Sequence, residues 1–539
     1  MATVTGAQAL VRQLIAEGVD TIFALPGVQI MAAFDAFHEY QDDIRLVHVR
    51  HEQATTYMAD GYAKATGKVG VAMAVPGPGA INAGSGLGTA YATSTPVLLI
   101  SGQIDSQSLG RREGQLHEVE DQLDVFRPLT KWVHRVTRVE DVPGAVHEAF
   151  KQLRTGRPRP VELEIPPDTL AATGEAETIP AEEYPPQAAG VDEIAQAADI
   201  LASAERPAIL VGGGARISGA GDEALQIADF LQAPLMGTQD SKGVVPESSP
   251  FYVGTNYASV GPADVVFPDS DVLLAIGTRL LFRELPDGDM PRIIHIDIDP
   301  DEIGRNLPTE LGIVADAKTA SAQLLDQLRE TSQPRPSDAD RIAGYRSDFA
   351  SRMRALVPPQ AQIIEDMRAA LPDDAIVVSG VTNIGYWSNV FFEVREPQTY
   401  ITSGYFGTLG YAFPTALGAQ VGRPDRKVIA LCGDGGFMYS PQELSSAMRH
   451  GINAVAVVFN NNAFGASEWD QTHRYGGNFI GTDLHNPDFV QLAQSFGAVG
   501  MSTDPEGFGE MLEVALNADA PVLLEVVIPN MMPPFQIVE

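Results

Sequence analysis

The feature that most constrains this chain is a Gly433-Asp434-Gly435 turn that lies between two apolar runs. Residues 428–432 before the turn have the length and composition of a buried strand. Residues 440–443 predict a helix start, with a serine cap, a proline in the first turn and a glutamate that returns the capping-box bond. We expect this helix to end near Gly451, before a second buried strand at residues 454–459. The pattern predicts a strand–helix–strand unit whose strands are parallel neighbours.

Polar side chains follow both predicted strands. Asp434 comes directly after the first strand and Asn461 directly after the second, at the carboxyl edge where α/β sheets bind ligands. Carboxylate and amide oxygens suit Mg²⁺ or Ca²⁺, and phosphate oxygens and water commonly complete a Mg²⁺ shell. Gly435 and Gly436 leave room for the backbone to approach a diphosphate, which a helix start also favours. The sequence therefore predicts a site for a metal ion and a diphosphate.

This segment resembles the diphosphate-binding motif of thiamine-diphosphate (ThDP) enzymes. The resemblance implies that Asp434, Asn461 and the carbonyl of Ala463 bind Mg²⁺, and that Gly433 contacts the cofactor. Many relatives have glycine at the Ala463 position, but a carbonyl ligand does not depend on the side chain. The resemblance also implies an α/β fold with three doubly wound parallel-sheet domains of the ThDP-enzyme type.

The length of the chain and two linker-like segments also favour three domains. A chain of 539 residues is about three domains long at ~150–200 residues each. Residues 171–190 and 330–340 are rich in Pro, Glu and Ala or Ser and lack apolar periodicity, so we predict linkers there. By resemblance, residues 1–172 form the pyrimidine-binding domain, 190–330 the central domain and 350–539 the diphosphate-binding domain.

Composition narrows the function. The chain has 36 basic and 70 acidic residues, a net charge of −34, which argues against binding nucleic acid or an anionic membrane surface. Its apolar runs are short and interrupted, so we expect no membrane span. Residues 1–6 lack the basic and apolar regions of a signal peptide, and the single cysteine, Cys432, fits a reducing compartment. We expect a cytoplasmic protein.

A second constellation lies in the first third of the chain. Arg50-His51-Glu52-Gln53 follows a predicted strand at residues 45–49 and opens a helix. An acidic residue in a first helical turn is commonly there because the helix dipole favours it. The segment also matches the His-Glu pair of ThDP enzymes, which implies that Glu52 binds the aminopyrimidine ring and moves its proton. An apolar pocket would raise the pKa of that carboxylate and improve it as an acid–base group.

Further segments resemble loops that line the cofactor in this family. Residues 76–82 resemble the Gly-Pro-Gly-Ala-Thr-Asn loop of acetolactate synthases, and residues 25–27 resemble an earlier Tyr-Pro-Gly loop. Residues 407–411 resemble the loop that holds the pyrimidine ring, with leucine where relatives often have methionine. Asn383 matches a glutamine that lies near the diphosphate in these relatives. The resemblance implies cofactor contacts by Pro26, Gly27, Asn82, Asn383, Gly407 and Leu409.

The middle third contains a glycine-rich turn, Gly212-Gly213-Gly214, after a predicted strand. Such a turn is more often required by geometry than by a dinucleotide. Acetolactate synthases carry a flavin in this domain near a Gly-x-Arg-Phe-Asp-Asp-Arg pattern. The matching run, residues 277–283, keeps both arginines but has Leu281 and Phe282 in place of the aspartates. We therefore do not expect bound FAD.

ThDP provides an electron sink for breaking or making a bond next to a carbonyl. The sequence most resembles acetolactate synthases, which implies decarboxylation of a 2-oxo acid followed by carboligation. The benzaldehyde lyase-like alternative is cleavage of 2-hydroxy ketones or diketones. A third alternative, a catalytically silent cofactor-binding paralogue, is disfavoured by the presence of Glu52. In this family Glu52 and the metal meet across a subunit interface, which implies a homodimer or homotetramer.

Two residues depart from the patterns of these subfamilies. Residues 116–132 resemble a segment that carries a substrate-side glutamine, and this chain has His117 there. Gln29 replaces a histidine of benzaldehyde lyase. We treat both as candidate catalytic residues. His117 is either a hydrogen-bonded loop residue or a group that delivers a proton near neutral pH, which glutamine cannot do. The second interpretation favours protonation or lyase chemistry over acetolactate formation.

Overall fold

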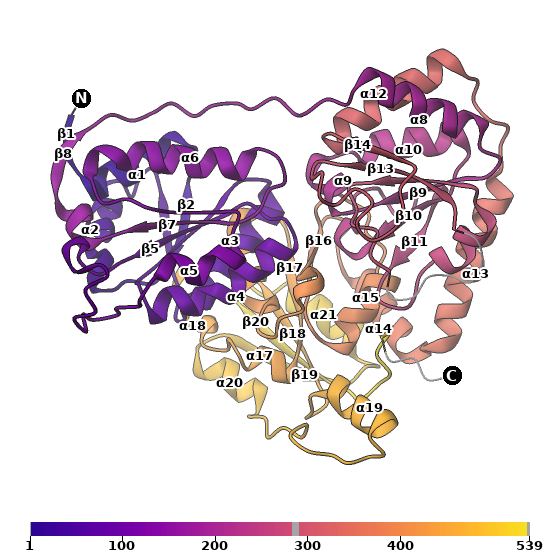
Figure 1. The fold of residues 1–539 in the computed structure, drawn as a ribbon. Helices are drawn as coiled ribbons and strands as arrows, with labels where there is room; N and C mark the ends of the chain where they lie inside the picture. Colours follow the sequence, from indigo (N-terminus) through magenta and orange to yellow (C-terminus); the bar gives the residue numbers. More distant parts are fainter. Residues whose placement is uncertain (1, 283–289, 536–539) are drawn as a thin grey trace.

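The computed structural model describes residues 2–282 and 290–535 (Figure 1). It contains three six-stranded sheets, one in each third of the chain, and every strand pairing within these sheets is parallel. Helices connect successive strands and cover both faces, since parallel strands need crossover connections. The predicted fold class is confirmed.

The first sheet has the strand order β3-β2-β4-β5-β7-β6. Helices α1 and α6 lie on one face of it, and α3, α4 and α5 lie on the other (Figure 1). Its strands are β2 (Thr21–Ala24), β3 (Arg45–His48), β4 (Gly70–Ala74), β5 (Val97–Gly102), β6 (Trp132–Arg135) and β7 (Val161–Ile165). Its helices are α1 (Gly6–Ala16), α2 (Met31–Glu39), α3 (Glu52–Thr66), α4 (Pro78–Ala92), α5 (Gln122–Phe126), α6 (Val142–Arg154) and α7 (Pro167–Ala171).

The central sheet has the order β11-β10-β9-β12-β13-β14. Its strands are β9 (Pro207–Val211), β10 (Leu235–Thr238), β11 (Tyr252–Asn256), β12 (Val272–Ile276), β13 (Arg292–Asp297) and β14 (Leu311–Val314). Its helices are α8 (Val191–Ser203), α9 (Gly213–Ser218), α10 (Gly221–Leu231), α11 (Ala263–Val266) and α12 (Ala317–Thr331). Helix α13 (Ala339–Leu356) follows and packs against β11.

The third sheet has the order β16-β15-β17-β18-β20-β19. Numbered from its own first strand this order is 2-1-3-4-6-5, the same as in the first sheet. Its strands are β15 (Ile376–Ser379), β16 (Tyr400–Thr402), β17 (Val428–Gly433), β18 (Val455–Asn460), β19 (Val499–Thr503) and β20 (Val522–Val527). Its helices are α14 (Pro358–Ala370), α15 (Asn383–Phe391), α16 (Ala412–Gly422), α17 (Asp434–Phe437), α18 (Glu443–His450), α19 (Gly465–Arg474), α20 (Phe489–Ser495) and α21 (Phe508–Leu516).

The shared strand order creates equivalent ligand-binding edges. The order reverses between β2 and β4 in the first sheet and between β15 and β17 in the third. Ligands of open α/β sheets bind outside the carboxyl ends of the strands at such reversals. These two edges are where the predicted pyrimidine-side and diphosphate-side residues begin.

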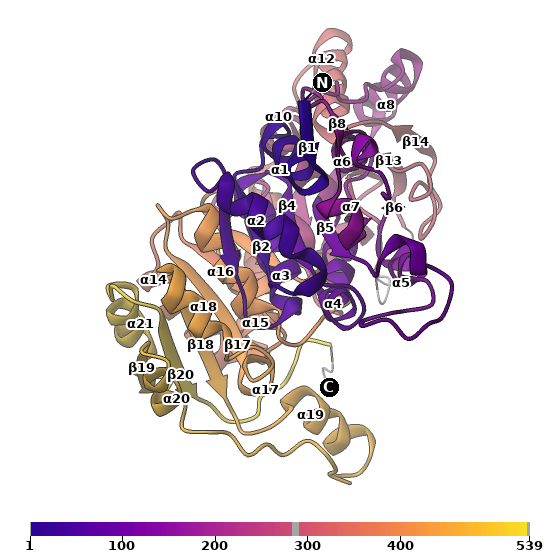
Figure 2. The same cartoon turned by 90° about the vertical axis from the view of Figure 1, so that its left-hand side faces the viewer.

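Helices α3 and α16 join the first and third domains (Figure 2). The two backbones approach so closely that a Cβ atom on Gly418 would lie 2.0 Å from the carbonyl oxygen of Met58. Next to this crossing Lys64 is buried, and its Nζ lies 2.8 Å from Asp60 Oδ2 and 3.0 Å from the carbonyl oxygen of Thr402. The junction therefore combines close helix packing with a buried ion pair that is hydrogen-bonded across the domains.

The first predicted linker needs correction. Residues 173–176 form strand β8 (Thr173–Ala176), which pairs antiparallel with β1 (Ala2–Thr5). The pairing partner is at the opposite end of the domain, so local composition did not reveal the strand. An extended segment then crosses from the first domain to α8 (Figure 1). The second predicted linker is shortened at both ends, because α12 runs to Thr331 and α13 begins at Ala339. Within the described residues, no helix is both long and apolar enough to cross a bilayer.

Candidate active site

The diphosphate-side site is built on the predicted strand–helix–strand unit, and β17 and β18 are parallel neighbours as expected. Asp434 is the first residue of α17, directly after β17, and its side chain is buried. The amide Nδ2 of Asn486 donates to Asp434 Oδ2 over 2.7 Å and to Asn460 Oδ1 over 3.1 Å. Burial raises the pKa of the Asp434 carboxyl above its ordinary value, so a nearby cation would favour its charged form.

The turn after β18 presents the other predicted metal ligands. The backbone N–H of Ala463 donates to Asn461 Oδ1 over 3.2 Å, and Asn462 has a left-handed φ of 56°. A Cβ atom on Gly465 would lie 2.5 Å from Asn461 Nδ2, so the glycine gives this amide its space. Because β17 and β18 are adjacent, the turn and Asp434 share one edge of the sheet. A carboxylate, an amide oxygen and a backbone carbonyl fit a hard cation such as Mg²⁺.

The predicted capping box at residues 440–443 is wrong. Helix α18 begins at Glu443 with Gln442 as its N-cap residue, and no side chain caps it. The Glu443 carboxylate instead accepts the backbone N–H groups of Arg50 and His51, at 3.1 and 3.0 Å. Glu443 therefore forms hydrogen bonds with the first domain and does not cap α18. The helix ends before Gly451, which has a left-handed φ of 63°, as predicted.

Three predicted cofactor segments meet at the switch point of the third sheet. A Cβ atom on Gly436 would lie 3.6 Å from Leu409 Cδ2, and one on Gly433 would lie 3.3 Å from Thr382 Oγ1. Asn383 opens α15, and its Nδ2 donates to the carbonyl oxygens of Met531 and Met532 over 2.8 and 3.2 Å. Its buried Oδ1 has no partner among the described residues. Gly407 and Gly410 have left-handed φ values of 59° and 83°, which shape the loop around Leu409.

Glu52 is the first residue of α3, as predicted, and is half-buried. His51 caps the helix, because its Nδ1 accepts the backbone N–H of Gln53 over 3.2 Å. Glu52 Oε2 accepts from Asn82 Nδ2 over 3.0 Å. Asn82 lies in α4, which begins at Pro78, so the predicted loop at residues 76–82 is largely the first turn of a helix. Two predicted site residues are thus in direct contact.

The remaining first-domain residues gather around the same edge. A Cβ atom on Gly27, next to Pro26, would lie 2.2 Å from Val75 Cγ1. One on Gly79 would lie 2.6 Å from Val75 Cγ2 and 3.3 Å from Glu52 Oε1. The loops after β2 and β4 therefore enclose the Glu52 carboxylate from one side.

Gln29 and His117 lie next to each other at this edge. Gln29 Nε2 donates to the carbonyl oxygen of Leu116 over 3.1 Å, and its buried Oε1 has no partner among the described residues. His117 has a left-handed φ of 68°, and its buried Nδ1 also has no partner in this part of the chain. The His117 carbonyl covers Gly77, whose added Cβ would lie 2.5 Å from it. The structure brings both substrate-side candidates to the turn after β4.

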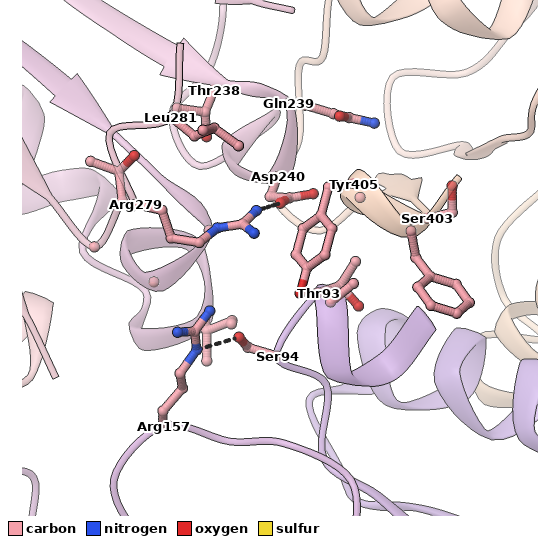
Figure 3. A pocket seen from close by; sticks show the side chains of 18 of the residues that line it. Thr93, Ser94, Arg157, Thr238, Gln239, Asp240, Arg279, Leu281, Ser403 and Tyr405 are labelled. Carbon is pink, nitrogen blue, oxygen red and sulfur yellow. Dashed lines mark hydrogen bonds and ion pairs between the residues drawn. The ribbon is translucent and has the colours of Figure 1, made fainter. Parts of the chain in front are cut away.

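A cavity of about 780 Å³ lies where the three domains meet, and Gly407 is among the residues that line it. Arg279 lies 3.3 Å from Asp240 and stacks over Tyr405 at 4.2 Å, while Arg157 donates to Ser94 Oγ over 2.9 Å (Figure 3). Leu281 is exposed beside this cavity. Residues 277–283 are the run that matches the flavin-associated pattern, and its last residue, Arg283, lies outside the described residues. The expectation that the chain binds no FAD stays a prediction.

The glycines at the start of α9 have a packing role. The backbone N–H of Gly214 donates to the carbonyl oxygen of Gly277 over 2.8 Å. A Cβ atom on Gly212 would lie 2.2 Å from the same oxygen. The Gly212-Gly213-Gly214 turn thus permits the loop after β12 to pack against α9, which supports the geometric interpretation.

Sequence reasoning missed two polar residues. Asn486 bonds to both Asp434 and Asn460 but lies in a loop without a recognised motif, so no local pattern indicated it. Glu443 was noticed only as a capping residue. Its burial against Arg50 and His51 depends on the packing of two domains that are far apart in the sequence.

Comparison with known proteins agrees with this arrangement. Residues 4–125 match the thiamine pyrophosphate enzyme N-terminal TPP binding domain, residues 194–328 the central domain and residues 380–526 the C-terminal TPP binding domain. TPP, or thiamine pyrophosphate, is another name for ThDP. The three matches follow the order of the three sheets.

Relatives span nearly the whole chain. A probable acetolactate synthase large subunit of Methanocaldococcus jannaschii is 35% identical over 97% of this chain and 92% of its own length. A probable 2-ketoarginine decarboxylase of Pseudomonas aeruginosa is 33% identical over 97% of this chain and 94% of its own. The acetolactate synthase large subunit of Haemophilus influenzae is 33% identical over 93% of this chain and 90% of its own. The chain therefore belongs to the ThDP-dependent enzymes, as an acetolactate synthase-like carboligase or decarboxylase.

Proposed function

We propose that this enzyme decarboxylates a small 2-oxo acid and joins the product to a second carbonyl compound, with ThDP and Mg²⁺ bound. Two polar clusters, one around Glu52 and one around Asp434, lie at the switch points of two sheets with the same strand order. This placement is the observation that carries the proposal. When bound, ThDP supplies an electron sink next to the substrate carbonyl.

The residues have distinct proposed roles at each edge. Asp434, Asn461 and the Ala463 carbonyl hold the Mg²⁺, and Asn486 orients the Asp434 carboxylate. Gly433, Gly435 and Gly436 admit the diphosphate. Leu409 would pack against the bound cofactor, and the Gly407 carbonyl and Asn383 would help to hold it. Glu52 accepts and returns a proton at the aminopyrimidine ring, with Asn82 holding its carboxylate.

We propose a homodimer or a homotetramer in which Glu52 of one subunit serves the diphosphate site of its partner. The hydrogen bond of Glu52 described above stays within its own domain, which leaves its other oxygen for a cofactor. We also propose a cytoplasmic location, which suits a chain whose single cysteine is the buried Cys432.

The second candidate function is cleavage of 2-hydroxy ketones or diketones. Its supporting observation is the buried, unpartnered His117 Nδ1 beside Gln29. An imidazole at the substrate edge can give a proton to the decarboxylated carbon or take one from a hydroxyl group. It would thereby compete with carboligation.

Product analysis separates the candidates. The purified enzyme, loaded with ThDP and Mg²⁺, is incubated with pyruvate alone, with a panel of longer 2-oxo acids and with 2-hydroxy ketones. Acetolactate or a related ligated product supports the proposal. Aldehyde alone, or turnover of the 2-hydroxy ketones alone, would overturn it in favour of the second candidate.

A further inference from the structure

A buried carboxylate of the third domain binds the turn that carries Glu52. Glu443 is fully buried at the first position of α18. Its Oε1 accepts the backbone N–H of Arg50 over 3.1 Å and that of His51 over 3.0 Å. Its Oε2 lies 3.2 Å from the Arg50 nitrogen and accepts from Ser446 Oγ over 2.6 Å. Both carboxylate oxygens are therefore used.

The two N–H groups lie immediately before α3, whose first residue is Glu52. The first N–H groups of a helix have no partner within the helix, and this end carries partial positive charge. An acceptor is therefore well placed here, and the carboxylate binds these N–H groups more strongly in its charged form, because charge-assisted hydrogen bonds are stronger than neutral ones. The acceptor fixes the backbone one residue before Glu52.

Neighbouring contacts tie the segments on either side of this turn to the third domain. Gln53 Nε2 donates to the carbonyl oxygen of Tyr439 over 3.1 Å. At the other end of α18, His450 Nε2 accepts the backbone N–H of His48 over 3.2 Å. Residues on both sides of Glu52 are thus tied to the third domain.

We propose that Glu443 is a positioning residue that orients Glu52 for cofactor activation by binding the backbone N–H groups of Arg50 and His51. This inference rests on the proposed role of Glu52. It couples correct docking of the third domain to activation of the cofactor. A mere domain anchor would change stability and assembly, but its effect would not depend on Glu52.

The test measures cofactor activation without any substrate. ThDP-loaded enzyme is diluted into deuterated buffer, quenched, and the exchange of the C2 proton of ThDP is followed by NMR. Glu443→Ala removes both acceptors, and Glu443→Asp keeps the charge but shortens the reach. Glu443→Gln keeps one acceptor oxygen and can donate to Ser446. His450→Ala is the matched control, since it weakens the same contact between domains away from Glu52.

We expect Glu443→Ala and Glu443→Asp to slow C2 exchange ~10–100-fold, the scale of a small misplacement, with nearly unchanged ThDP affinity. Glu443→Gln and His450→Ala should stay within about threefold of wild type. In a Glu52→Gln background, Glu443→Ala should cause no further loss. In the enzyme without cofactor, amide hydrogen exchange should rise at residues 50–53 in Glu443→Ala.

Three results would overturn the proposal: unchanged C2 exchange in Glu443→Ala and Glu443→Asp, equal slowing in His450→Ala, or a full additional loss in the Glu52→Gln background. If Glu52→Gln itself leaves C2 exchange unchanged, the proposed role of Glu52 fails and the positioning role fails with it. A wrong substrate assignment leaves all these readings intact, because none of them uses a substrate.

Discussion

The Asp434 carboxylate is buried and lies within hydrogen-bond distance of the Asn486 amide. Desolvation alone would favour its neutral form, so the charged form depends on compensating partners. A divalent cation would be the strongest of these, because a bound metal ion is commonly the largest local charge in a site. Asp434 and Asn486 therefore make different contributions to the same site.

We expect Asp434→Ala to lose a charged ligand and weaken Mg²⁺-dependent ThDP binding by ~100-fold or more, beyond the ~10–100-fold typical of an outer partner. Asn486→Ala, as the matched comparison, should fall in that ~10–100-fold range. Calorimetric titration of ThDP at fixed Mg²⁺ measures both. Unchanged binding in Asp434→Ala would refute the ligand assignment.

Replacing Glu52 should lower turnover and not cofactor affinity, in contrast to replacing Asp434. Glu52→Gln keeps the shape of the side chain but cannot accept the proton, so turnover should fall ~100-fold or more. ThDP affinity, measured by the same titration, should change much less. Wild-type turnover in this variant would show that cofactor activation uses another group.

His117 is tested through the product ratio. His117→Gln removes the imidazole beside Gln29 that can deliver a proton, so the ratio of aldehyde to ligated product should fall. The ratio is measured by chromatography at one fixed pH. If the mutation does not move the ratio, His117 is a structural loop residue and acetolactate synthesis remains the first candidate.

At the scale of elements, local patterns predicted what local residues determine. Strands β17 and β18, the end of α18 at Gly451 and the start of α3 at Glu52 follow from apolar runs and helix boundaries within a few residues. Strand β8 was missed because its partner, β1, lies at the other end of the domain. The capping box failed for the same kind of reason, since the partners of Glu443 are in the first domain.

The close packing of α3 on α16 can be tested with a substitution at Gly418. Gly418→Ala would ordinarily favour a helix by up to ~1 kcal/mol. Here the added Cβ would lie 2.0 Å from the Met58 carbonyl oxygen, so the helices must separate. We expect a net loss of ~1–3 kcal/mol in the free energy of unfolding, typical of overpacking.

Gly344→Ala is the matched control for this change. Gly344 lies in α13, and an added Cβ would meet nothing within 4 Å. That variant should gain up to ~1 kcal/mol. Denaturant unfolding at one protein concentration compares the two variants. A stabilised Gly418→Ala would show that the two helices are not held this close.

At the scale of the whole molecule, the contact between the first and third domains contains a titrating group. Burial raises the pKa of Glu443 to about 7, although Ser446, the N–H groups of Arg50 and His51 and the Arg50 charge lower it. In the unfolded chain the carboxyl returns to its ordinary value of 4.5. The folded state therefore holds a proton that the unfolded state releases between these values, and stability falls as pH rises through this window.

Glu443→Gln should abolish this contribution. The difference in unfolding free energy between Glu443→Gln and wild type should shift in favour of the variant as pH rises from about 4.5 to 7, and level off above that. Denaturant titrations at several pH values measure the difference. A difference independent of pH would mean that Glu443 titrates normally in the folded enzyme.

The packing of α3 on α16 also sets an order of events during synthesis. The first sheet and its β1–β8 closure are complete once residue 176 has emerged, and that domain can fold. Gly418 follows Met58 by 360 residues, so α16 arrives roughly 20–70 s later at ~5–20 residues per second. Throughout that interval the face of α3 around Met58, and the backbone before Glu52, lack the partners that bury them in the finished enzyme. The nascent chain thus exposes the apolar face of α3 during this interval, and we expect the ribosome-bound intermediate to be prone to aggregation through it.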